Sequence, residues 1–305
     1  MILCCGEALI DMLPRETGAG EPAFAPYPGG AVFNTAIALG RLGARTGFFC
    51  PMPADLFGAQ LRAALTASGV DHSLSPDVDR PCTLAFVTLV NGQARYAFYD
   101  RGTALRDLTI ADLPPLPDDV EALFLGGISL VGDPCGAAFA ALADHARDRV
   151  VMCDPNIRPS FIRDEPAYRA RLATLLARAD LVKVSDEDLH WLMGPGDVAD
   201  LAGALRAQGP RVVIVTEGAE GARGFYAGGV VQVSAPRVSV VDTVGAGDTF
   251  NAGVLASLAQ NGALTRAQIA ALDAATLHRA LTLGARAAAV TVSRAGANPP
   301  FAHEL

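Results

Sequence analysis

Residues 238–253 read VSVVDTVGAGDTFNAG. A β-branched run, Val238–Val241, leads into a turn with two glycines, Gly245 and Gly247, and an alanine-rich helix is predicted over about 247–260. Glycine allows a positive φ and a close approach of the backbone to a ligand. The first N–H groups of a helix have no partner within the helix and lie at the positive end of its dipole. The stretch therefore predicts an anion site suited to a phosphate group.

Asp248 stands in the first turn of this helix, beside the predicted anion site. Many acids at helix N-termini serve only the helix dipole. A carboxylate next to a phosphate weakens phosphate binding, so its presence favours another role, that of a general base for an attacking hydroxyl. The stretch is not a Walker A loop, because the single lysine, Lys183, follows Val182, and it lacks the third glycine of a dinucleotide fingerprint. Backbone amides, arginine and Mg²⁺ must then hold the phosphates.

Elsewhere, short apolar runs alternate with longer amphipathic segments. The runs predict buried strands at Ile2–Cys5, Ala122–Leu125, Val150–Cys153, Leu181–Val184 and Val212–Thr216. The segments predict helices near 31–42, 54–68, 134–147, 166–178, 186–193, 197–207, 247–260 and 266–290. This alternation is typical of an α/β fold with a mostly parallel central sheet and helices on both faces.

Two regions break this pattern. Residues 82–101 alternate apolar and polar side chains, and the dipeptide Asn91-Gly92 between the two halves is a strong signal for an antiparallel hairpin. Residues 12–28 contain four prolines. Because an isolated hairpin needs a partner surface, we expect the two regions to form a small β lid beside the main sheet. Its open edge predicts a homodimer through the lid strands, since exposed strands pair readily.

Composition narrows the classes of function. The net charge is −8 and no basic stripe is visible, so no nucleic-acid partner is expected. The first residues lack the basic region of a signal peptide, and the apolar stretches are too short for a membrane span. The six cysteines are scattered without a CxxC pair, as expected for reduced core thiols in a cytoplasmic protein. The five histidines show no ligand spacing, so no zinc site is predicted.

Two motifs of the chain resemble signatures of the ribokinase-like (PfkB) carbohydrate kinases. The C-terminal signature of that family is a D-T-x-G-A-G-D turn, which stands here as DTVGAGD at 242–248. The N-terminal signature is a Gly-Gly pair followed by a helix that carries an asparagine, here Gly29, Gly30 and Asn34. The resemblance extends over residues 6–297.

The resemblance implies a Rossmann-like, ribokinase-like fold and a reaction. One catalytic domain would span 1–305, with a lid formed by about 12–28 and 82–101. The enzyme would transfer the γ-phosphoryl group of ATP in line to a sugar hydroxyl, with Mg²⁺ as cofactor, and such transfer depends mainly on positioning and electrostatics. Closure of the lid would exclude water.

The resemblance also implies site residues. Asp248 would be the general base, and the amides of Gly245, Ala246 and Gly247 would form the anion hole. Arg158, in a DPNIR segment similar to that of fructokinases and related hexose or ketoacid kinases, would reach the phosphate or the substrate with its rigid guanidinium fork. Sugar binding would fall to Asp11, Gly29, Gly30, Asn34, Tyr96, Phe98, Arg101 and Asn156. ATP binding would fall to Lys183, Ser185, Thr216, Gly218, Gly245 and Gly247.

The metal sites follow the family less closely. Many members carry an Asn-x-x-Glu motif near Mg²⁺, where this chain has Ser185 and Asp188. Asp188 can still act through water, because Mg²⁺ keeps several waters in such sites. Some members use a monovalent cation such as K⁺, and the matching carboxylate here is Asp242.

The lid segment 95–104 is similar to that of fructokinases, so fructose is the expected substrate and fructose 6-phosphate the product. 2-Keto-3-deoxygluconate is an alternative whose carboxylate would need a cation from Arg95, Arg101 or Arg106. A carbohydrate-sensing protein without catalysis is a second alternative, against which Asp248 and its glycines count. A nucleotide-dependent oxidoreductase is a third, disfavoured by the missing glycine.

Overall fold

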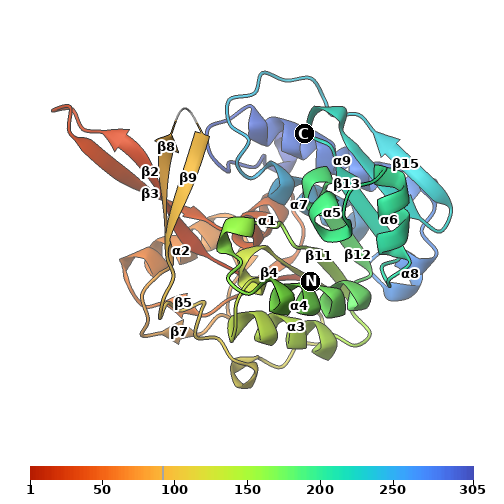
Figure 1. The fold of residues 1–305 in the computed structure, drawn as a ribbon, viewed down its shortest axis with the longest axis horizontal. Coiled ribbons are helices and arrows are strands. Elements are labelled where there is room, and N and C mark those ends of the chain that lie inside the picture. Colours follow the sequence, from red (N-terminus) through yellow and green to blue (C-terminus); the bar gives the residue numbers. More distant parts are fainter. Residues whose placement is uncertain (91–92) are drawn as a thin grey trace.

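A nine-stranded sheet forms the centre of the protein in a computed structural model, which describes residues 1–90 and 93–305, without the side chains of 89, 90 and 93–96 (Figure 1). Its strands are β1 (Ile2–Cys5), β4 (Thr46–Phe49), β6 (Val70–Asp71), β10 (Ala122–Gly126), β11 (Val150–Asp154), β12 (Leu181–Ser185), β13 (Val212–Thr216), β14 (Ala222–Tyr226) and β15 (Gly229–Val233). They lie in the order β15-β14-β13-β12-β11-β10-β1-β4-β6. Neighbours from β6 to β13 pair in parallel, and the β13–β14 and β14–β15 pairs are antiparallel.

The strands predicted from apolar runs all belong to this sheet. β1, β10 and β11 are buried along their full length, as expected where helices cover both faces of parallel strands. The pattern does not predict β4, β6, β14 or β15. β6 is only two residues long, and Arg223 and Gly224 interrupt the apolar run of β14.

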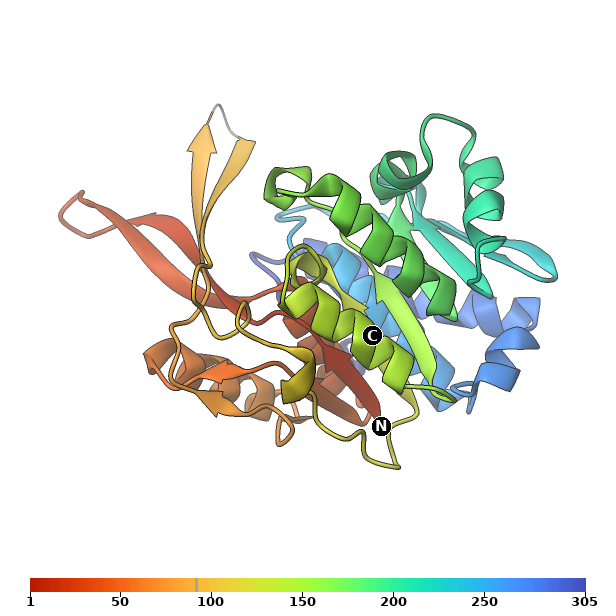
Figure 2. The same cartoon turned by 60° about the horizontal axis from the view of Figure 1, so that its bottom comes forward.

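Helices cover the sheet on both faces. They are α1 (Ala31–Arg41), α2 (Leu56–Ala67), α3 (Cys135–His145), α4 (Glu165–Arg178), α5 (Asp186–Met193), α6 (Val198–Arg206), α7 (Ala246–Gln260), α8 (Arg266–Ala270) and α9 (Ala274–Val292). Short 3₁₀ turns are η1 (Ile110–Asp112), η2 (Gly127–Leu130), η3 (Pro159–Phe161), η4 (Gly218–Glu220) and η5 (Ala302–Glu304). Helix α7 packs between α1 and α9 on one face, and α3 to α6 cover the other (Figures 1 and 2). The α/β architecture is as predicted.

The prediction of one helix over 266–290 is wrong, because the structure contains two helices there. α8 ends at Ala270, and Asp273 caps the start of α9 by accepting a hydrogen bond from the Thr276 amide at 2.7 Å. An aspartate that accepts an N-terminal amide favours a new helix start over continuation of the old helix.

The four-stranded lid sheet stands apart from the main sheet (Figure 1). Its strands are β2 (Leu9–Glu16), β3 (Pro22–Gly29), β8 (Leu84–Val90) and β9 (Gln93–Tyr99), in the order β3-β2-β8-β9. β2 pairs with β3 and β8 with β9 in antiparallel fashion, while β2 and β8 are parallel. The two predicted lid regions therefore meet, although the predicted Asn91-Gly92 turn lies outside the described residues. A further small pair joins β5 (Met52–Pro53) and β7 (Asp77–Val78).

The prolines of the lid lie where a missing N–H is tolerated. Three of the four are in β3, an edge strand that pairs only with β2 in the described sheet. Pro14 belongs to β2, but β8 pairs with β2 only along Ile10–Met12, so Pro14 lies beyond that pairing. Within the described ranges, no helix combines the length and the hydropathy needed to cross a membrane.

Candidate active site

A polar cavity of about 590 Å³ lies where the main sheet meets the lid. It collects residues that directly follow β1, β10, β11, β12 and β13, so it lies at the carboxyl ends of the parallel strands, the usual ligand site of open α/β sheets. The turn before α7 closes it from the side. Among the residues that line it are Glu7, Asp11, Gly30, Asn34, Phe98, Asn156, Arg158, Phe161, Lys183, Ser185, Asp188, Thr216, Gly218, Gly245, Ala246, Gly247 and Asp248.

The glycine turn has the backbone geometry of an anion site. Gly245 adopts a φ of 78° directly before α7, and a Cβ at this position would lie 2.7 Å from the Cβ of Ala297. The amides of the first turn of α7 thus face the cavity without side-chain caps. The preceding run, Val238–Val241, is irregular rather than a strand, and the side chains of Val240 and Val241 are exposed.

Asp248 is a buried carboxylate in the first turn of α7. Burial raises its pKa to about 7, and the hydrogen bond from the Asn34 side-chain amide, 2.9 Å from Asp248 Oδ2, opposes that shift. The Thr35 hydroxyl donates to the Asp248 carbonyl at 3.2 Å and ties α1 to α7. A carboxylate with this pKa can accept a proton near neutral pH.

Glu7 holds the start of α1 in place, a contact that the sequence analysis does not anticipate. Its buried carboxylate accepts hydrogen bonds from the amides of Ala31, at 2.9 Å, and Ser129, at 3.1 Å. Gly30 adopts a φ of 109°, and a Cβ there would lie 2.8 Å from the Glu7 carbonyl oxygen. An acid inside the otherwise apolar start of the chain is the signal that could have indicated this role.

Asp11 extends from the base of the lid into the cavity. Burial raises its pKa to about 6. Gly29, on the neighbouring strand β3, leaves room for this carboxylate, because an added Cβ would overlap Asp11 Oδ2. The two predicted sugar-site residues therefore lie in contact, and Gly29 acts through the space that it leaves.

A second buried group surrounds the single lysine. Lys183 Nζ donates to Asp154 Oδ2 at 3.0 Å, and the Asn251 side-chain amide donates to the same oxygen at 2.7 Å. A Cβ at Gly247 would lie 3.1 Å from Lys183 Nζ, so the ammonium group borders the anion site. Asp154 also accepts the amide of Asn156 at 3.1 Å and shapes the loop that follows β11. Sequence reasoning missed Asp154 and Asn251 as partners of Lys183.

Asp188 lines the cavity near this group. Its Oδ1 accepts the Ile157 amide at 3.2 Å, and the Ser185 hydroxyl accepts the Asp188 amide at 3.0 Å as the cap of α5. Burial, followed by the charge of Asp154, raises the pKa of Asp188. Among the described residues, no group of three or more His, Cys, Asp or Glu side chains could hold a metal ion alone. A Mg²⁺ ion here would rely on Asp188, waters and substrate phosphates, which is a common arrangement for this ion.

Asp242 is fixed by backbone amides. Its Oδ1 accepts the Val244 amide at 3.0 Å, and its Oδ2 accepts the Gly296 amide at 2.9 Å. The carboxylate therefore links the glycine turn to the segment after α9. This position fits a role in shaping the anion site and leaves open lone pairs for a cation.

A second cavity of about 630 Å³ joins the first at the glycine turn. Both are lined by Thr216, Gly218, Thr243, Ala246 and Gly247. The rest of the second lining is largely apolar and includes Val238, Val240, Phe250, Ala285, Ala288, Ala289 and Val292. A polar cavity and an apolar cavity that meet at an anion site suit a polyol on one side and a flat heterocycle on the other.

Three predicted sugar-site residues have different outcomes. Phe98 lines the polar cavity and stacks edge-on with Phe161, with 4.1 Å between ring centroids. Phe161 also lines this cavity, although the sequence did not predict it as a sugar-site residue. Arg101 lines a neighbouring cavity instead, and the side chain of Tyr96 lies outside the described residues.

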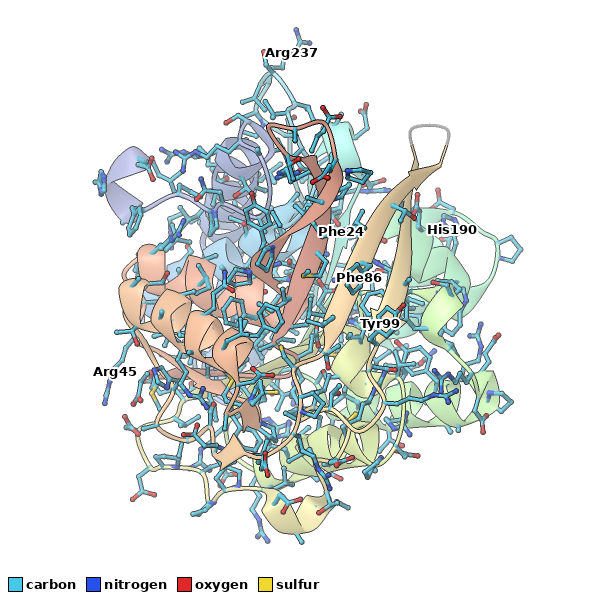
Figure 3. All side chains as sticks on the ribbon, turned by 90° about the vertical axis from the view of Figure 1, so that its left-hand side faces the viewer. Phe24, Arg45, Phe86, Tyr99, His190 and Arg237 are labelled. Atoms are coloured by element: carbon cyan, nitrogen blue, oxygen red, sulfur yellow. The ribbon has the colours of Figure 1, made fainter. Side chains whose placement is uncertain are left out.

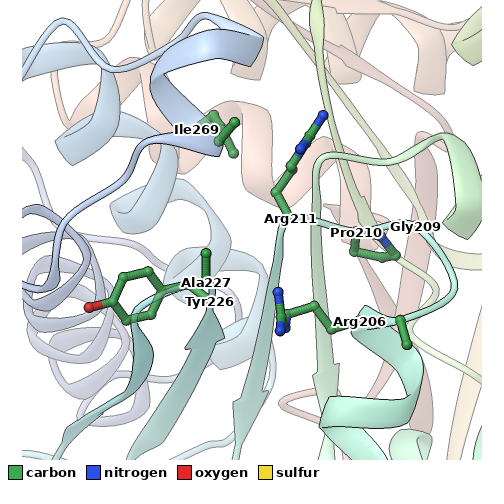
Figure 4. Close-up of a pocket in the computed structure, with 9 residues that line it drawn as sticks. Arg206, Gly209, Pro210, Arg211, Tyr226, Ala227 and Ile269 are labelled. Atoms are coloured by element: carbon green, nitrogen blue, oxygen red, sulfur yellow. The ribbon is translucent and has the colours of Figure 1, made fainter.

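A smaller hollow of about 270 Å³ lies at the other end of the sheet, next to the start of β13 (Figure 4). Arg206, Arg211, Tyr226 and Ile269 are among its lining residues. It contains neither a carboxylate nor a helix-starting turn, so it lacks the parts of a transfer site.

The whole chain matches a known family. Residues 1–304 match the family described as pfkB family carbohydrate kinase. The chain belongs to this family. A fructokinase from Rhizobium leguminosarum bv. trifolii is 57% identical over 274 residues, which is 90% of this chain and 84% of the relative.

Solved structures of a fructokinase and of a riboside kinase share the fold. The crystal structure of fructokinase with bound ATP from Xylella fastidiosa is 28% identical, with a TM-score of 0.88 over 97% of this chain and 93% of that one. Aminoimidazole riboside kinase from Salmonella enterica, complexed with aminoimidazole riboside and an ATP analogue, is also 28% identical. Its TM-score is 0.84 over 99% of this chain and 97% of that one. This pfkB-family chain is therefore a sugar kinase with the predicted ribokinase-like fold.

Proposed function

We propose that this sugar kinase uses ATP to phosphorylate fructose and forms fructose 6-phosphate. The observation that carries the proposal is the Asp248 carboxylate, buried beside the helix-start amides with a pKa raised to about 7. The 57% identity to a fructokinase supports fructose as the sugar. We further propose that residues 1–305 act as a single catalytic domain.

Asp248 serves as the general base in this mechanism. It takes the proton of the C6 hydroxyl while the oxygen attacks the γ-phosphorus and the bond to the β–γ bridging oxygen breaks. Asn34, 2.9 Å from the carboxylate, orients the Asp248 oxygen and leaves the other oxygen for the sugar. The products are the phosphorylated sugar, ADP and a proton on Asp248.

The amides of Gly245, Ala246 and Gly247 stabilise the transferred phosphoryl group. Preorganised N–H donors at a helix start require no rearrangement as charge develops, which makes them effective for transition-state stabilisation. Lys183 contributes a positive charge from the other side of Gly247. Arg158, which lines the cavity, contributes a second cation toward the phosphates.

The remaining roles divide between the two cavities. Asp11, Gly30, Asn34, Asn156 and Phe98 bind the sugar in the polar cavity, and Gly29 leaves room for Asp11. Ser185, Thr216 and Gly218 bind ATP where the polar and apolar cavities meet. Bound Mg²⁺ would neutralise phosphate charge, with Asp188 holding it through water. A monovalent cation such as K⁺ would lie by Asp242.

2-Keto-3-deoxygluconate gains no support as the substrate. Its carboxylate needs a free cation at the sugar, and the described arginine of the polar cavity is Arg158. The side chain of Arg95, one of the three arginines predicted for this role, lies outside the described residues. Arg101 and Arg106 line the neighbouring cavity, and Arg106 is paired with Asp100 at 2.7 Å. The sensing alternative is disfavoured by the intact Asp248 site.

We also propose a homodimer formed through the lid. Figure 3 looks onto the lid, where Phe24, Phe86 and Tyr99 form an aromatic cluster. Tyr99 is 64% exposed and Phe24 is 42% exposed. Covering such rings on a second copy would remove them from water. We expect a cytoplasmic location, which the six free, buried cysteines support.

A panel assay tests the function. Purified protein with Mg-ATP is given fructose, 2-keto-3-deoxygluconate, ribose, aminoimidazole riboside and glucose, and ADP release is measured. We expect fructose to give the highest kcat/KM. A tenfold or larger preference for another sugar would reject fructose, and ADP release that no sugar stimulates would reject the kinase activity.

A further inference from the structure

A third polar cavity, of about 610 Å³, lies beside the candidate active site. Phe98 and Phe161 line both cavities, and their stacked rings form the wall between them. The opposite side of the third cavity comes from the segment after β9, from the loop before α3 and from the start of α4. Its remaining lining is Asp100, Arg101, Gly102, Arg106, Val131, Gly132, Asp133, Ser160, Arg163, Asp164, Ala167 and Arg171.

The acids of this cavity already have partners. Asp100 pairs with Arg106, and Asp133 pairs with Arg171 and accepts the Ala137 amide. Asp164 caps α4 by accepting the Ala167 amide at 3.0 Å. Arginines therefore compensate the charges of Asp100 and Asp133, and Asp164 is held by a backbone amide.

Two arginines are left over. Arg101 and Arg163 are exposed, and neither has a hydrogen-bond or ion-pair partner among the described residues. Together with the two paired arginines, they give this cavity four cations against three carboxylates, in a chain with a net charge of −8. Such a local excess of cations attracts an anion.

We propose that this cavity is a second ligand site, which binds a phosphorylated sugar. The free guanidinium groups of Arg101 and Arg163 suit the dianion of a phosphate monoester, since each offers a fork of donors to phosphate oxygens. The cavity is too large for phosphate alone, and its volume lies within the usual range for small-molecule sites.

The rest of the lining fits sugar hydroxyls. The Ser160 hydroxyl can donate and accept, and the paired carboxylates of Asp100 and Asp133 keep lone pairs for hydroxyl donors. The aromatic wall offers an apolar surface to the C–H groups of the sugar ring.

Calorimetry with glucose 6-phosphate tests the proposal. Saturating fructose and ADP are present, so that the active site is occupied, and the titration is repeated without them. We expect one glucose 6-phosphate per chain to bind under both conditions. Inorganic phosphate serves as the second probe and should bind at least tenfold more weakly. Circular dichroism checks the folding of every variant.

Substitution of the free arginines supplies the specific test. Hydrogen bonds to charged groups are worth enough that each of Arg101→Gln and Arg163→Gln should weaken binding by about tenfold or more. The matched control is Arg279→Gln, which replaces an exposed arginine of α9 that donates a hydrogen bond to the Thr276 hydroxyl of its own helix. The control should bind as the native protein does.

Three outcomes overturn the proposal. The first would be that the native protein shows no binding of glucose 6-phosphate at millimolar concentration while fructose and ADP are bound. The second would be that a variant carrying both Arg101→Gln and Arg163→Gln binds glucose 6-phosphate as tightly as the native protein does. The third would be that inorganic phosphate binds as tightly as the sugar phosphate, because the cavity would then be an anion site without a sugar subsite.

Discussion

The main sheet and the lid sheet differ in how their faces are covered. In the main sheet, β10 and β11 have helices on both faces and are buried along their length. In the lid, Phe98 of β9 faces the candidate active site, and the next residue, Tyr99, points outward with 64% of its surface exposed. Strand alternation thus turns one side chain of β9 toward the candidate active site and the next toward solvent.

Because of this difference, we expect substitutions in the two sheets to affect different measurable properties. The main sheet is covered by helices of its own chain, whereas we propose that the lid is covered by the sugar on one side and by a second copy on the other. Substitutions in the main sheet and its covering helices, here called the body, should therefore change catalysis or folding. Substitutions in the lid should change sugar binding or association.

The largest expected effect is that of Asp248→Asn, in the body. Removal of the general base should lower kcat by a factor on the order of 10²–10⁴, with the fold and ligand binding retained. A coupled assay for kcat, calorimetry for binding and circular dichroism for folding provide the measurements. Asp273→Asn, at the start of α9, is the control and should keep native kcat. A folded Asp248→Asn protein with more than about a tenth of native kcat would contradict the mechanism.

Core truncation should distinguish the two sheets by stability. Phe124→Ala in β10 removes a ring that is 1% exposed and should lower the free energy of unfolding by about 3–5 kcal/mol. Tyr27→Ala in β3 removes a ring that is 43% exposed and should lower it by less than about 1 kcal/mol. Denaturant unfolding measures both. Similar losses for the two variants would show that the lid is part of the same folding core.

The pH dependence of kcat/KM should report one carboxylate from each region. Asp248, with a pKa of about 7, must be unprotonated to act as a base, so kcat/KM should fall about tenfold per pH unit below pH 7. Asp11 has a pKa of about 6, and its protonation removes an acceptor for the sugar, so the fall should steepen below pH 6. The additional fall should appear in KM and vanish in Asp11→Asn. A constant slope down to pH 5 in the native protein would argue against the role of Asp11.

Association should respond to the lid alone. Native protein at micromolar concentration should show twice the mass of one chain in light scattering. Tyr99→Glu places like charges at the proposed contact and should weaken the dimer by at least about tenfold, with little change in kcat. Val230→Glu alters a side chain of β15 that is 55% exposed, and should remain dimeric. A monomeric native protein would refute the lid dimer.

Local signals predict the body of this fold well. Apolar runs identify central strands, and the glycines before Asp248 identify the turn that precedes α7, because each signal depends on residues close together in the chain. The contact between Asn34 and Asp248 joins residues that are 214 positions apart. For that reason the sequence suggests each residue separately but not the hydrogen bond between them.

The supporting residues were hardest to predict for the same physical reason. Glu7, Asp154 and Asn251 act through partners that only the tertiary structure brings near, and each alone resembles an ordinary core or loop residue. Phe161 becomes part of the site only because η3 brings it against Phe98. The run Val238–Val241 has strand-like composition but no neighbouring strand, and composition cannot supply one.

The single lysine has a practical consequence for proteolysis. A protease that cleaves only after lysine has one target bond in this chain, between Lys183 and Val184 in β12, which has paired strands on both sides. Cleavage must wait until the central sheet opens, because a protease needs an extended, accessible segment. When opening and closing are fast compared with cleavage, the rate at which two fragments appear follows the free energy of that opening. The rate of digestion by such a protease therefore reports the free energy of opening the central sheet around β12. Ligands that bind the folded protein should slow this digestion.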